Sequence, residues 1–314
     1  MEYGAGITAA VTASFIDLVT ARIKEVLTSE GSIQKILAYI QQTSGKMIRP
    51  TLASLVFQLC GGESEAALLD AAAGIELIHM ASLIHDDIID RSDLRRDAFT
   101  VQKQFGVEAA VLAGDFLFAR AFNLFTNSEP RQVLAVMTDV ISQMCIGEIQ
   151  QLMDPVVKEA DYWQYIYQKT ACFIEGACRV GAVAARTAEL REVELLSKFG
   201  LALGYAYQLT DDLLDYTAEP KTTGKTPGND FQQGIWTLPI IRGVESGVIP
   251  ANWHQELSFT EARKLLEQHG IFQEIQRDTD FYIRQAQAIL LSFPDHPART
   301  KLLELAEFIG TRQH

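Results

Sequence analysis

Helical periodicity runs through most of this sequence, and signals for β-strands are scarce. Apolar residues recur at intervals of three and four, and proline is nearly absent inside these segments. Two of the segments, 64–85 and 174–185, are apolar on all sides, and a helix of that kind is covered by other helices. We therefore predict one all-α domain with a central ring of long helices. The expected helical segments are 8–28, 48–60, 63–91, 100–124, 131–152, 160–186, 190–216, 258–291 and 298–312.

The bulk properties of the chain suit one large helical bundle. Its 314 residues are 48% hydrophobic, and we find no linker, short repeat or low-complexity run, so we predict a single domain over residues 1–314. The formal net charge of −13 disfavours binding to nucleic acid or to an anionic membrane by general electrostatics. Any phosphate site must therefore be a local group of lysine and arginine side chains.

Cysteine usage and hydropathy bear on the cellular compartment. The four cysteines form no CxxC pair, as expected of reduced thiols in a cytoplasmic protein. No basic segment precedes an apolar core near the N-terminus, so we expect no signal peptide. The most apolar stretch, 71–84, contains Glu76 and His79, and on that ground we expect no transmembrane segment.

An aspartate-rich pentapeptide, 86–90 (DDIID), ends one of the apolar helices. Asp86 and Asp90 are four residues apart and share a helix face, where two carboxylates repel each other. The C-terminal end of a helix also disfavours negative charge. Such local conflicts tend to mark functional sites, and carboxylate oxygens without a His or Cys cluster suit a hard cation. We therefore predict a Mg²⁺ site here.

The same spacing recurs in 211–215 (DDLLD), again at the end of an apolar helix. A single copy is equally well explained as a solvated acidic helix end, whereas two copies with one spacing are poorly explained in that way. Asp211 and Asp215 are the outer carboxylates of this second motif. Two facing clusters would bind several Mg²⁺ ions around one diphosphate and make it a better leaving group.

Basic residues near these motifs are candidates for phosphate contacts. Arg95 and Arg96 follow the first motif, and an arginine pair beside a metal site in an acidic chain is best interpreted as a phosphate clamp. His79 lies about two turns before Asp86 on the same face, where a core role and a ligand-binding role are equally consistent. The stretch 217–239, rich in glycine and proline, is expected to be a lid or binding loop. The other candidates are Lys46, Arg49, Lys169, Thr170, Gln208 and Lys225.

These residues together give a resemblance to the polyprenyl synthetase family of trans-isoprenyl diphosphate synthases. LIHDDIIDRSDLRR is similar to the first aspartate-rich motif of the family, and YQLTDDLLD is similar to the second. SGKMIRP, AGDFLF, GEIQQ, YQKTACF and GKTPGNDFQQGIWTLPI occur in the family's order, over about residues 40–245. The likeness is greatest to medium- and long-chain members, such as the catalytic component of heptaprenyl diphosphate synthase.

The resemblance implies the isoprenoid synthase fold, a single-domain helical bundle around a central cavity. It implies a Mg²⁺-dependent prenyltransferase that condenses an allylic diphosphate with successive isopentenyl diphosphates and releases pyrophosphate. It also implies three Mg²⁺ ions with substrate bound, and a product that serves as a quinone side-chain precursor. The expected assembly is a homodimer, or a heterodimer with a small regulatory subunit.

The resemblance assigns a role to each matching residue. The metal ligands would be Asp86, Asp90 and Asp211, supported by Asp87 and Asp215. The allylic diphosphate would contact Arg95, Lys169 and Lys225. Isopentenyl diphosphate would contact Lys46, Arg49, His79 and Arg96. The reacting carbons would lie against Thr170 and Gln208.

Five positions depart from the family pattern. Ser44 and Met47 replace a glycine and an arginine of the first cationic motif, and Asp97 stands where glycine follows the arginine pair. Ile235 replaces a frequent lysine, and Tyr207 replaces a phenylalanine. Losing two cations would weaken diphosphate binding, whereas the aspartates expected to bind metal are all present.

Small residues upstream of Asp86 bear on product length. Ala81, Ser82 and Gly74 lie one to three turns back along the helix, and the growing chain is expected to run beside them. A passage on this side would stay open for about 18 Å, at 1.5 Å per residue. Because short-chain members usually have an aromatic residue near Ala81, the resemblance implies a hexaprenyl to octaprenyl product.

Three other functions are open at this stage. His85 and Asp86 form an HD dipeptide, as in metal-dependent phosphohydrolases, although the other histidines lack suitable motifs. A non-catalytic subunit with the same fold would tend to lose one aspartate motif, and both are complete here. A terpene cyclase shares the carbocation chemistry but usually lacks the cations for a second diphosphate.

Overall fold

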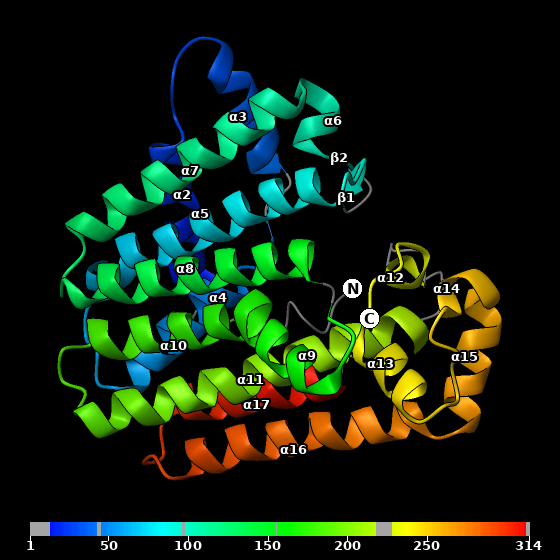
Figure 1. Cartoon of the computed structure of the whole chain (residues 1–314). Coiled ribbons are helices and arrows are strands. Elements are labelled where there is room, and N and C mark those ends of the chain that lie inside the picture. Colours follow the sequence, from blue (N-terminus) through cyan, green and yellow to red (C-terminus); the bar gives the residue numbers. More distant parts are fainter. Residues whose placement is uncertain (1–12, 43–44, 96–97, 155, 218–227, 312–314) are drawn as a thin grey trace. The chain divides into compact units, whose positions relative to one another are not determined.

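The computed structural model describes residues 13–42, 45–95, 98–154, 156–217 and 228–311, and it confirms the all-α prediction (Figure 1). Regular structure in these residues is helical, apart from one antiparallel pair of two-residue strands, β1 (Leu94–Arg95) and β2 (Ala98–Phe99).

The chain divides into two compact units. The first comprises 1–138, 177–196 and 295–302, and the second comprises 139–176, 197–294 and 303–314. The helices with residues in both units are α8 (Gln132–Met153), α10 (Cys172–Ala184), α11 (Leu190–Thr217) and α17 (Pro297–Thr311). The single domain expected from the sequence stays a prediction.

The first unit contains a closely packed helix pair, α5 (Ala66–Ile89) and α7 (Val107–Asn127) (Figure 1). The two helices are antiparallel, since Gly74 meets the ring of Phe125 and Gly114 meets the ring of His85. A Cβ atom at either glycine would collide with the facing ring, so glycine permits the close approach. The other elements of this unit are α2 (Ala13–Val26), α3 (Ser32–Gln42), α4 (Ile48–Leu59) and α6 (Val101–Phe105).

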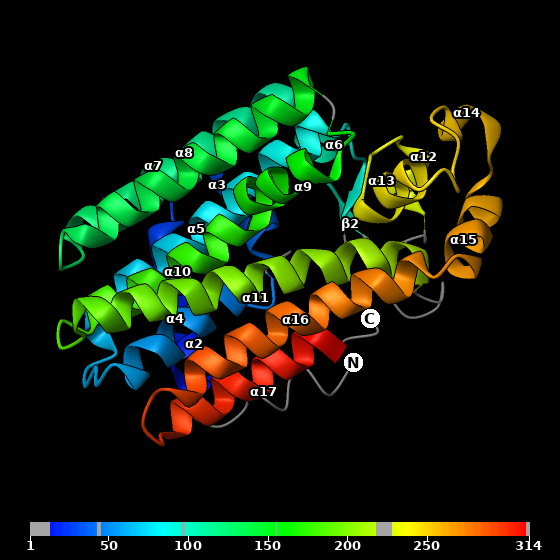
Figure 2. The same ribbon diagram turned by 60° about the horizontal axis from the view of Figure 1, so that its bottom comes forward.

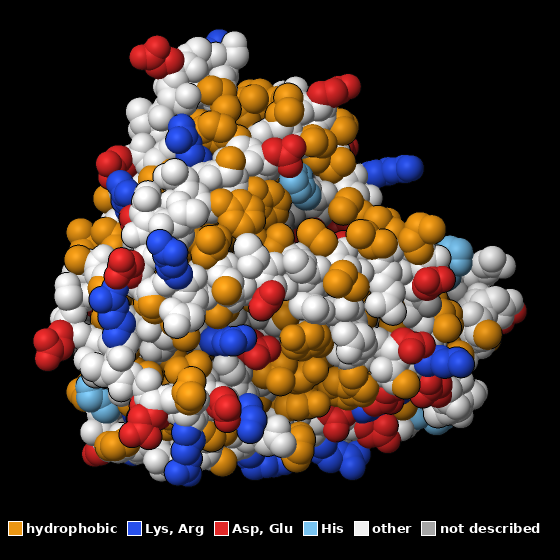
Figure 3. Space-filling model, turned by 60° about the vertical axis from the view of Figure 1, so that its left-hand side comes forward, with side chains coloured by type: hydrophobic (Ala, Val, Ile, Leu, Met, Phe, Trp, Pro, Cys, Tyr) orange, Lys and Arg blue, Asp and Glu red, His pale blue; other side chains and the backbone are white. Residues whose placement is uncertain are grey.

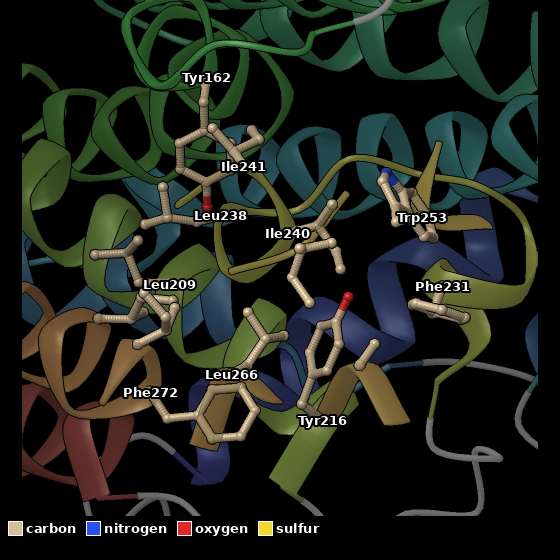
Figure 4. Close-up of a cluster of buried hydrophobic side chains, with 14 of the residues drawn as sticks. Tyr162, Leu209, Tyr216, Phe231, Leu238, Ile240, Ile241, Trp253, Leu266 and Phe272 are labelled. Atoms are coloured by element: carbon tan, nitrogen blue, oxygen red, sulfur yellow. The ribbon is translucent and has the colours of Figure 1, made fainter. Parts of the chain in front are cut away.

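A cluster of aromatic and aliphatic side chains forms the core of the second unit (Figure 4). Tyr162, Tyr216 and Trp253 are its largest members, and each is buried almost completely. Within this unit α11, α16 and α17 lie side by side (Figures 1 and 2), and Thr210 Oγ1 donates to the Ile309 carbonyl oxygen at 3.3 Å. The cluster also draws on α9 (Glu159–Ile166), α12 (Asn229–Gln232), α13 (Leu238–Glu245), α14 (Trp253–Glu256), α15 (Phe259–Gln268) and α16 (Ile271–Leu291).

Several boundaries differ from the sequence prediction, each for a local reason. The segment 258–291 is two helices, because Gly270 has a φ of 76° and separates α15 from α16. The segment 160–186 is interrupted by a π-helical turn, Tyr167–Ala171. Helix α3 was not predicted, and with only Leu37 and Ile40 buried it has a short apolar pattern. The expected loop 217–239 contains the short helix α12 and ends in the first turn of α13.

Among the described residues, three helices are long and apolar enough to cross a membrane by length and composition alone: α5, α7 and α8. Helix α5 thus has the length and composition of a membrane-spanning helix although it contains Glu76 and His79, the two residues on which we based the expectation of no transmembrane segment. In α5, however, 67% of the apolar window is buried inside the protein, and Glu76 itself is 1% exposed. Much of the apolar surface of α5 is thus used for packing between helices.

A partly buried arginine joins three helices of the second unit. Arg242 on α13 donates to the two carboxylate oxygens of Glu159 at 3.0 and 2.6 Å, and lies 2.6 Å from Asp278. Hydrogen bonds from Arg242 lower the pKa of Glu159. A carboxyl group with a lowered folded pKa stabilises the fold above its unfolded pKa, and this contribution is lost as the pH falls through the folded pKa.

We expect Arg242→Met to lower the free energy of unfolding at pH 7 by about 3 kcal/mol, because two carboxylates lose their shared cation. The loss should shrink at acid pH, as the pH falls through the lowered folded pKa of Glu159. Chemical denaturation at pH 7 and at acid pH measures the effect. The control is Lys103→Met, which breaks an exposed pair with Asp93 and should cost less than about 1 kcal/mol. Equal losses in the two variants would contradict the assignment.

Candidate active site

The first aspartate motif stands at the C-terminal end of α5, in the first unit. Asp90 is exposed, Asp86 is half-buried and Asp87 is 5% exposed. Arg95 Nε donates to Asp87 Oδ1 at 2.8 Å. Burial raises the pKa of Asp87, and the positive charge of Arg95 opposes the rise. Arg95, expected to contact a diphosphate, thus holds the buried carboxylate of the motif, whereas Asp86 and Asp90 are more accessible.

The residue before this motif, His85, packs against α7. Its Nε2 lies 3.3 Å from the Val111 carbonyl oxygen and 3.7 Å from Asp115 Oδ1, and its ring lies 5.6 Å from that of Phe118. These contacts engage the imidazole in helix packing. The geometry around His85 therefore does not support the alternative that His85 and Asp86 form the HD dipeptide of a metal-dependent phosphohydrolase.

A small cavity of about 50 Å³ lies beside the first motif, within the first unit. Its lining includes His79, Asp87 and Arg95, and the expected substrate contact of His79 stays a prediction. Glu76 also lines it and is 1% exposed, and the sequence analysis gave this carboxyl group no role. The sequence feature that could have identified Glu76 is a glutamate on an otherwise apolar helix, three residues before His79.

The first cationic segment precedes α4. Lys46 is exposed and Arg49 is half-buried in the first turn of the helix. Met47, one of the departures from the family pattern, has a φ of 52° and occupies the N-cap position with its side chain buried. Four residues named from the sequence lie outside the described residues: Ser44, Arg96, Asp97 and Lys225.

The second aspartate motif lies near the C-terminal end of α11, in the second unit. Asp211 is exposed and Asp215 is half-buried. The backbone N–H groups of Asn229 and Asp230 donate to the Asp215 carboxylate at 3.1 and 3.3 Å. Asp215 therefore holds the first residues of α12, and its expected part in metal binding stays a prediction.

Asp212, between these two residues, is 4% exposed and was assigned no role from the sequence. It accepts hydrogen bonds from the Tyr162 hydroxyl at 2.7 Å, the Gln208 amide at 2.7 Å and the Leu238 backbone N–H at 3.3 Å. Burial raises the pKa of Asp212 to about 7, and the Gln208 and Tyr162 hydrogen bonds oppose the rise. The motif thus contains a buried carboxyl group that joins its own helix, α11, to α9 and α13.

A π-helical turn carries two of the expected site residues, Lys169 and Thr170. Such turns are rare and occur frequently at functional sites. Lys169 Nζ lies 3.3 Å from Gln151 Oε1 and 3.6 Å from Glu148 Oε1, and Thr170 Oγ1 donates to Gln208 Oε1 at 2.6 Å. Within the second unit Lys169 thus contacts residues of α8, and Thr170 is bonded to Gln208 of α11. The substrate contacts expected of these three residues stay predictions.

The three small residues expected to govern product length lie along α5. Ala81 is fully buried, and the half-buried Ser82 donates its hydroxyl to the His79 carbonyl oxygen at 2.9 Å. Gly74 faces Phe125, whose ring fills the space beside it. The missing side chain of Gly74 thus leaves room for a phenyl ring of α7, and the chain-length roles of Gly74, Ala81 and Ser82 stay predictions.

The carboxylate chemistry of both motifs suits a hard cation. Among the described residues, no three His, Cys, Asp or Glu side chains are grouped closely enough to hold a metal ion by themselves. Mg²⁺ usually binds through one or two carboxylates, keeps several waters and takes further ligands from substrate phosphates. Asp86 and Asp90 in the first unit suit binding of that kind, and so does Asp211 in the second unit.

Comparison with known proteins agrees with this chemistry. The family model for polyprenyl synthetase matches residues 30–265. The chain belongs to this family. The assignment made from the two aspartate motifs is thereby confirmed.

Relatives within the polyprenyl synthetase family cover nearly the whole chain. Octaprenyl diphosphate synthase of Escherichia coli is 37% identical over 96% of this chain and 97% of that protein. Geranylgeranyl diphosphate synthase of Methanosarcina mazei is 33% identical over 94% and 95%. Heptaprenyl diphosphate synthase component 2 of Geobacillus stearothermophilus is 32% identical over 93% of each.

The fold is also that of a solved polyprenyl synthase. The crystal structure of the enzyme from Caulobacter crescentus, complexed with calcium and isoprenyl diphosphate, matches with a TM-score of 0.88 and 31% identity. The match covers 100% of this chain and 98% of that one. The expected isoprenoid synthase fold is therefore confirmed.

Proposed function

We propose that this protein is a Mg²⁺-dependent trans-prenyltransferase, which condenses an allylic diphosphate with successive isopentenyl diphosphates and releases pyrophosphate. The observation that carries the proposal is the recurrence of one aspartate motif at the ends of two long helices, with accessible first aspartates, in a member of the polyprenyl synthetase family. The relatives named as octaprenyl and heptaprenyl synthases support a medium- or long-chain product.

In this proposal Asp86, Asp90 and Asp211 hold the metal ions, with Asp87 and Asp215 in support. Bound Mg²⁺ supplies positive charge that neutralises the diphosphate and improves it as a leaving group. The calcium and isoprenyl diphosphate in the Caulobacter crescentus structure support a divalent cation at such a site. The number of ions, three with substrate bound, is part of the proposal.

The remaining residues position two substrates. We assign Lys169, Arg95 and Lys225 to the allylic diphosphate. We assign Lys46, Arg49, His79 and Arg96 to isopentenyl diphosphate. The allylic carbon–oxygen bond breaks, the double bond of isopentenyl diphosphate attacks the resulting carbocation, and the released pyrophosphate takes the proton. Side-chain charges fixed in a water-poor site lower the barrier to this ionisation.

The direct test is an assay with farnesyl diphosphate, isopentenyl diphosphate and Mg²⁺. We expect Asp86→Asn and Asp211→Asn each to lower turnover about 100-fold or more, because each removes a metal ligand. The matched control is Asp161→Asn, at an exposed position of α9, which should keep the wild-type rate. Rates close to wild type in both motif variants would refute the proposal. A folded wild-type protein that releases no pyrophosphate with any partner would instead indicate a non-catalytic subunit.

We further propose a hexaprenyl to octaprenyl product, used as a quinone side-chain precursor. The support is the octaprenyl and heptaprenyl diphosphate synthases among the relatives, and the small Ala81 near which short-chain members usually have an aromatic residue. Because geranylgeranyl synthases are also close relatives, product analysis is needed to decide the length.

We expect Ala81→Phe to shorten the main product, since the added ring would obstruct the growing chain. Ser82→Phe, at a half-buried position, provides a variant with less strain on the core. Ala119→Phe, at an exposed position of α7, is the control. Reversed-phase chromatography of the dephosphorylated products measures the change. An unaltered product distribution in folded Ala81→Phe and Ser82→Phe would show that the chain does not pass these residues.

The apolar surface of α8 supports the proposal of a homodimer. In the second unit Ile146, Ile149, Leu152 and Met153 are between 48% and 73% exposed and follow one another at helical spacing. On the face shown in Figure 3, hydrophobic side chains also form patches among charged ones. Exposed apolar patches of this kind commonly mark protein interfaces.

We propose that none of the three long apolar helices crosses a membrane and that the protein is cytoplasmic, where its four free cysteines would stay reduced.

Ile149→Asp is expected to convert the dimer to a monomer, because a carboxylate would be buried in the interface. Ala135→Asp, at an exposed position on an earlier turn of α8, should leave the dimer intact. Light scattering after size-exclusion chromatography reports the mass against 34.9 kDa for one chain. A monomeric wild type would contradict the homodimer and favour the heterodimer with a small subunit.

A further inference from the structure

The hydrogen bonds around Asp212 form a chain that leads to Thr170. Gln208 Nε2 donates to Asp212 Oδ1 at 2.7 Å, and Thr170 Oγ1 donates to Gln208 Oε1 at 2.6 Å. All three residues belong to the second unit. Asp212 and Thr170 are 4% and 7% exposed, so water competes little for these bonds.

Two further donors fix the other oxygen of Asp212. The Tyr162 hydroxyl and the Leu238 backbone N–H both donate to Oδ2, at 2.7 and 3.3 Å. Figure 4 shows the hydroxyl end of Tyr162 directed toward Leu238. In its ionised form Asp212 only accepts hydrogen bonds, and both of its oxygens have donors, so the NH₂ side of the Gln208 amide faces it.

The orientation of that amide decides what the Thr170 hydroxyl can do. With its NH₂ group bound to Asp212, Gln208 presents its carbonyl oxygen to Thr170, and this oxygen only accepts. The single proton of the Thr170 hydroxyl is therefore committed to Gln208. The Thr170 oxygen keeps only its lone pairs for any other neighbour.

We propose that Asp212 is a positioning residue, which fixes the Gln208 amide so that Thr170 presents lone pairs, and no proton, to the reacting carbons. This inference rests on the proposed function and on the family resemblance, which implies that Thr170 lies beside the reacting carbons. An oxygen of that kind stabilises positive charge as it develops on the carbon, and its orientation is set before the reaction begins. Asp212 touches neither substrate in this account and acts through two other side chains.

The variant Asp212→Asn should reverse the chain without removing any side chain. Its amide oxygen would remain where Tyr162 and Leu238 donate, so its NH₂ group would face Gln208. Gln208 would then turn its carbonyl oxygen toward residue 212 and its NH₂ group toward Thr170. The Thr170 oxygen would accept from Gln208, and its proton would point toward the reacting carbons.

The experiment is a double-mutant cycle on kcat between Asp212→Asn and Thr170→Val, with farnesyl and isopentenyl diphosphates as substrates. We expect Asp212→Asn to lower kcat about tenfold or more with little change in KM, because only the transition state carries the extra positive charge. The double variant should be no slower than Asp212→Asn alone, since the misdirected hydroxyl is absent from it. Thr170→Ser, which keeps the hydroxyl, should keep most of the activity and remain sensitive to Asp212→Asn.

Two further variants separate this role from a structural one. Tyr162→Phe removes one donor to the same carboxylate and leaves the amide orientation unchanged, so its effect on kcat should be small and should multiply with that of Thr170→Val. Gln208→Met removes the amide that links Asp212 to Thr170. In this background Thr170→Val should have no further effect on kcat. The Gln208–Thr170 cycle therefore tests the inference even if Asp212→Asn does not fold. Losses that multiply in both the Asp212–Thr170 and the Gln208–Thr170 cycles would overturn the inference and leave the proposed function intact. An inactive wild type would overturn both.

Discussion

A buried carboxyl group at the second position of each aspartate motif constrains the rest of this structure. Asp87 is held by Arg95, and Asp212 is held by Tyr162, Gln208 and the backbone of Leu238. An apolar helix can end in a carboxylate cluster only if the inward-facing member is bonded in this way, because an unpaired buried charge is too costly. The neighbouring first aspartates, Asp86 and Asp211, are thereby left more accessible. The two motifs thus share their spacing and also the contrast between a more accessible first aspartate and a buried second aspartate.

The bonds made by the inward-facing aspartates explain why two short sequence motifs organise elements that are far apart in the chain. Asp212 contacts residues 50 positions before it and 26 positions after it, and Asp215 holds the start of α12. The second motif therefore fixes the C-terminal part of the segment 217–239, at Asn229, Asp230 and Leu238. In the first unit, Arg95 links the strand β1 to the end of α5 in a similar way. Within each motif the second aspartate thus holds local structure, and the proposed metal binding belongs mainly to the first aspartate.

The helices, the family and both motifs could be predicted because each depends on a pattern that is local in the sequence. Which aspartate turns inward could not, since it depends on distant partners such as Tyr162. The π-helical turn under Lys169 has no comparable pattern, and Phe125 faces Gly74 only because of the register between α5 and α7. The small residues of α5 therefore do not by themselves show an open passage, because a residue of the facing helix can fill the space, as Phe125 does at Gly74.

We propose that both aspartate motifs take part in binding one diphosphate through Mg²⁺ ions. Calorimetric titration of pyrophosphate into the protein, with Mg²⁺ and with EDTA, tests it most directly. We predict tight binding with Mg²⁺ only, and an equal loss of affinity in Asp86→Asn, in Asp211→Asn and in the double variant, because the second loss has nothing left to remove. Binding that persists in EDTA, or losses that add in the double variant, would contradict the account.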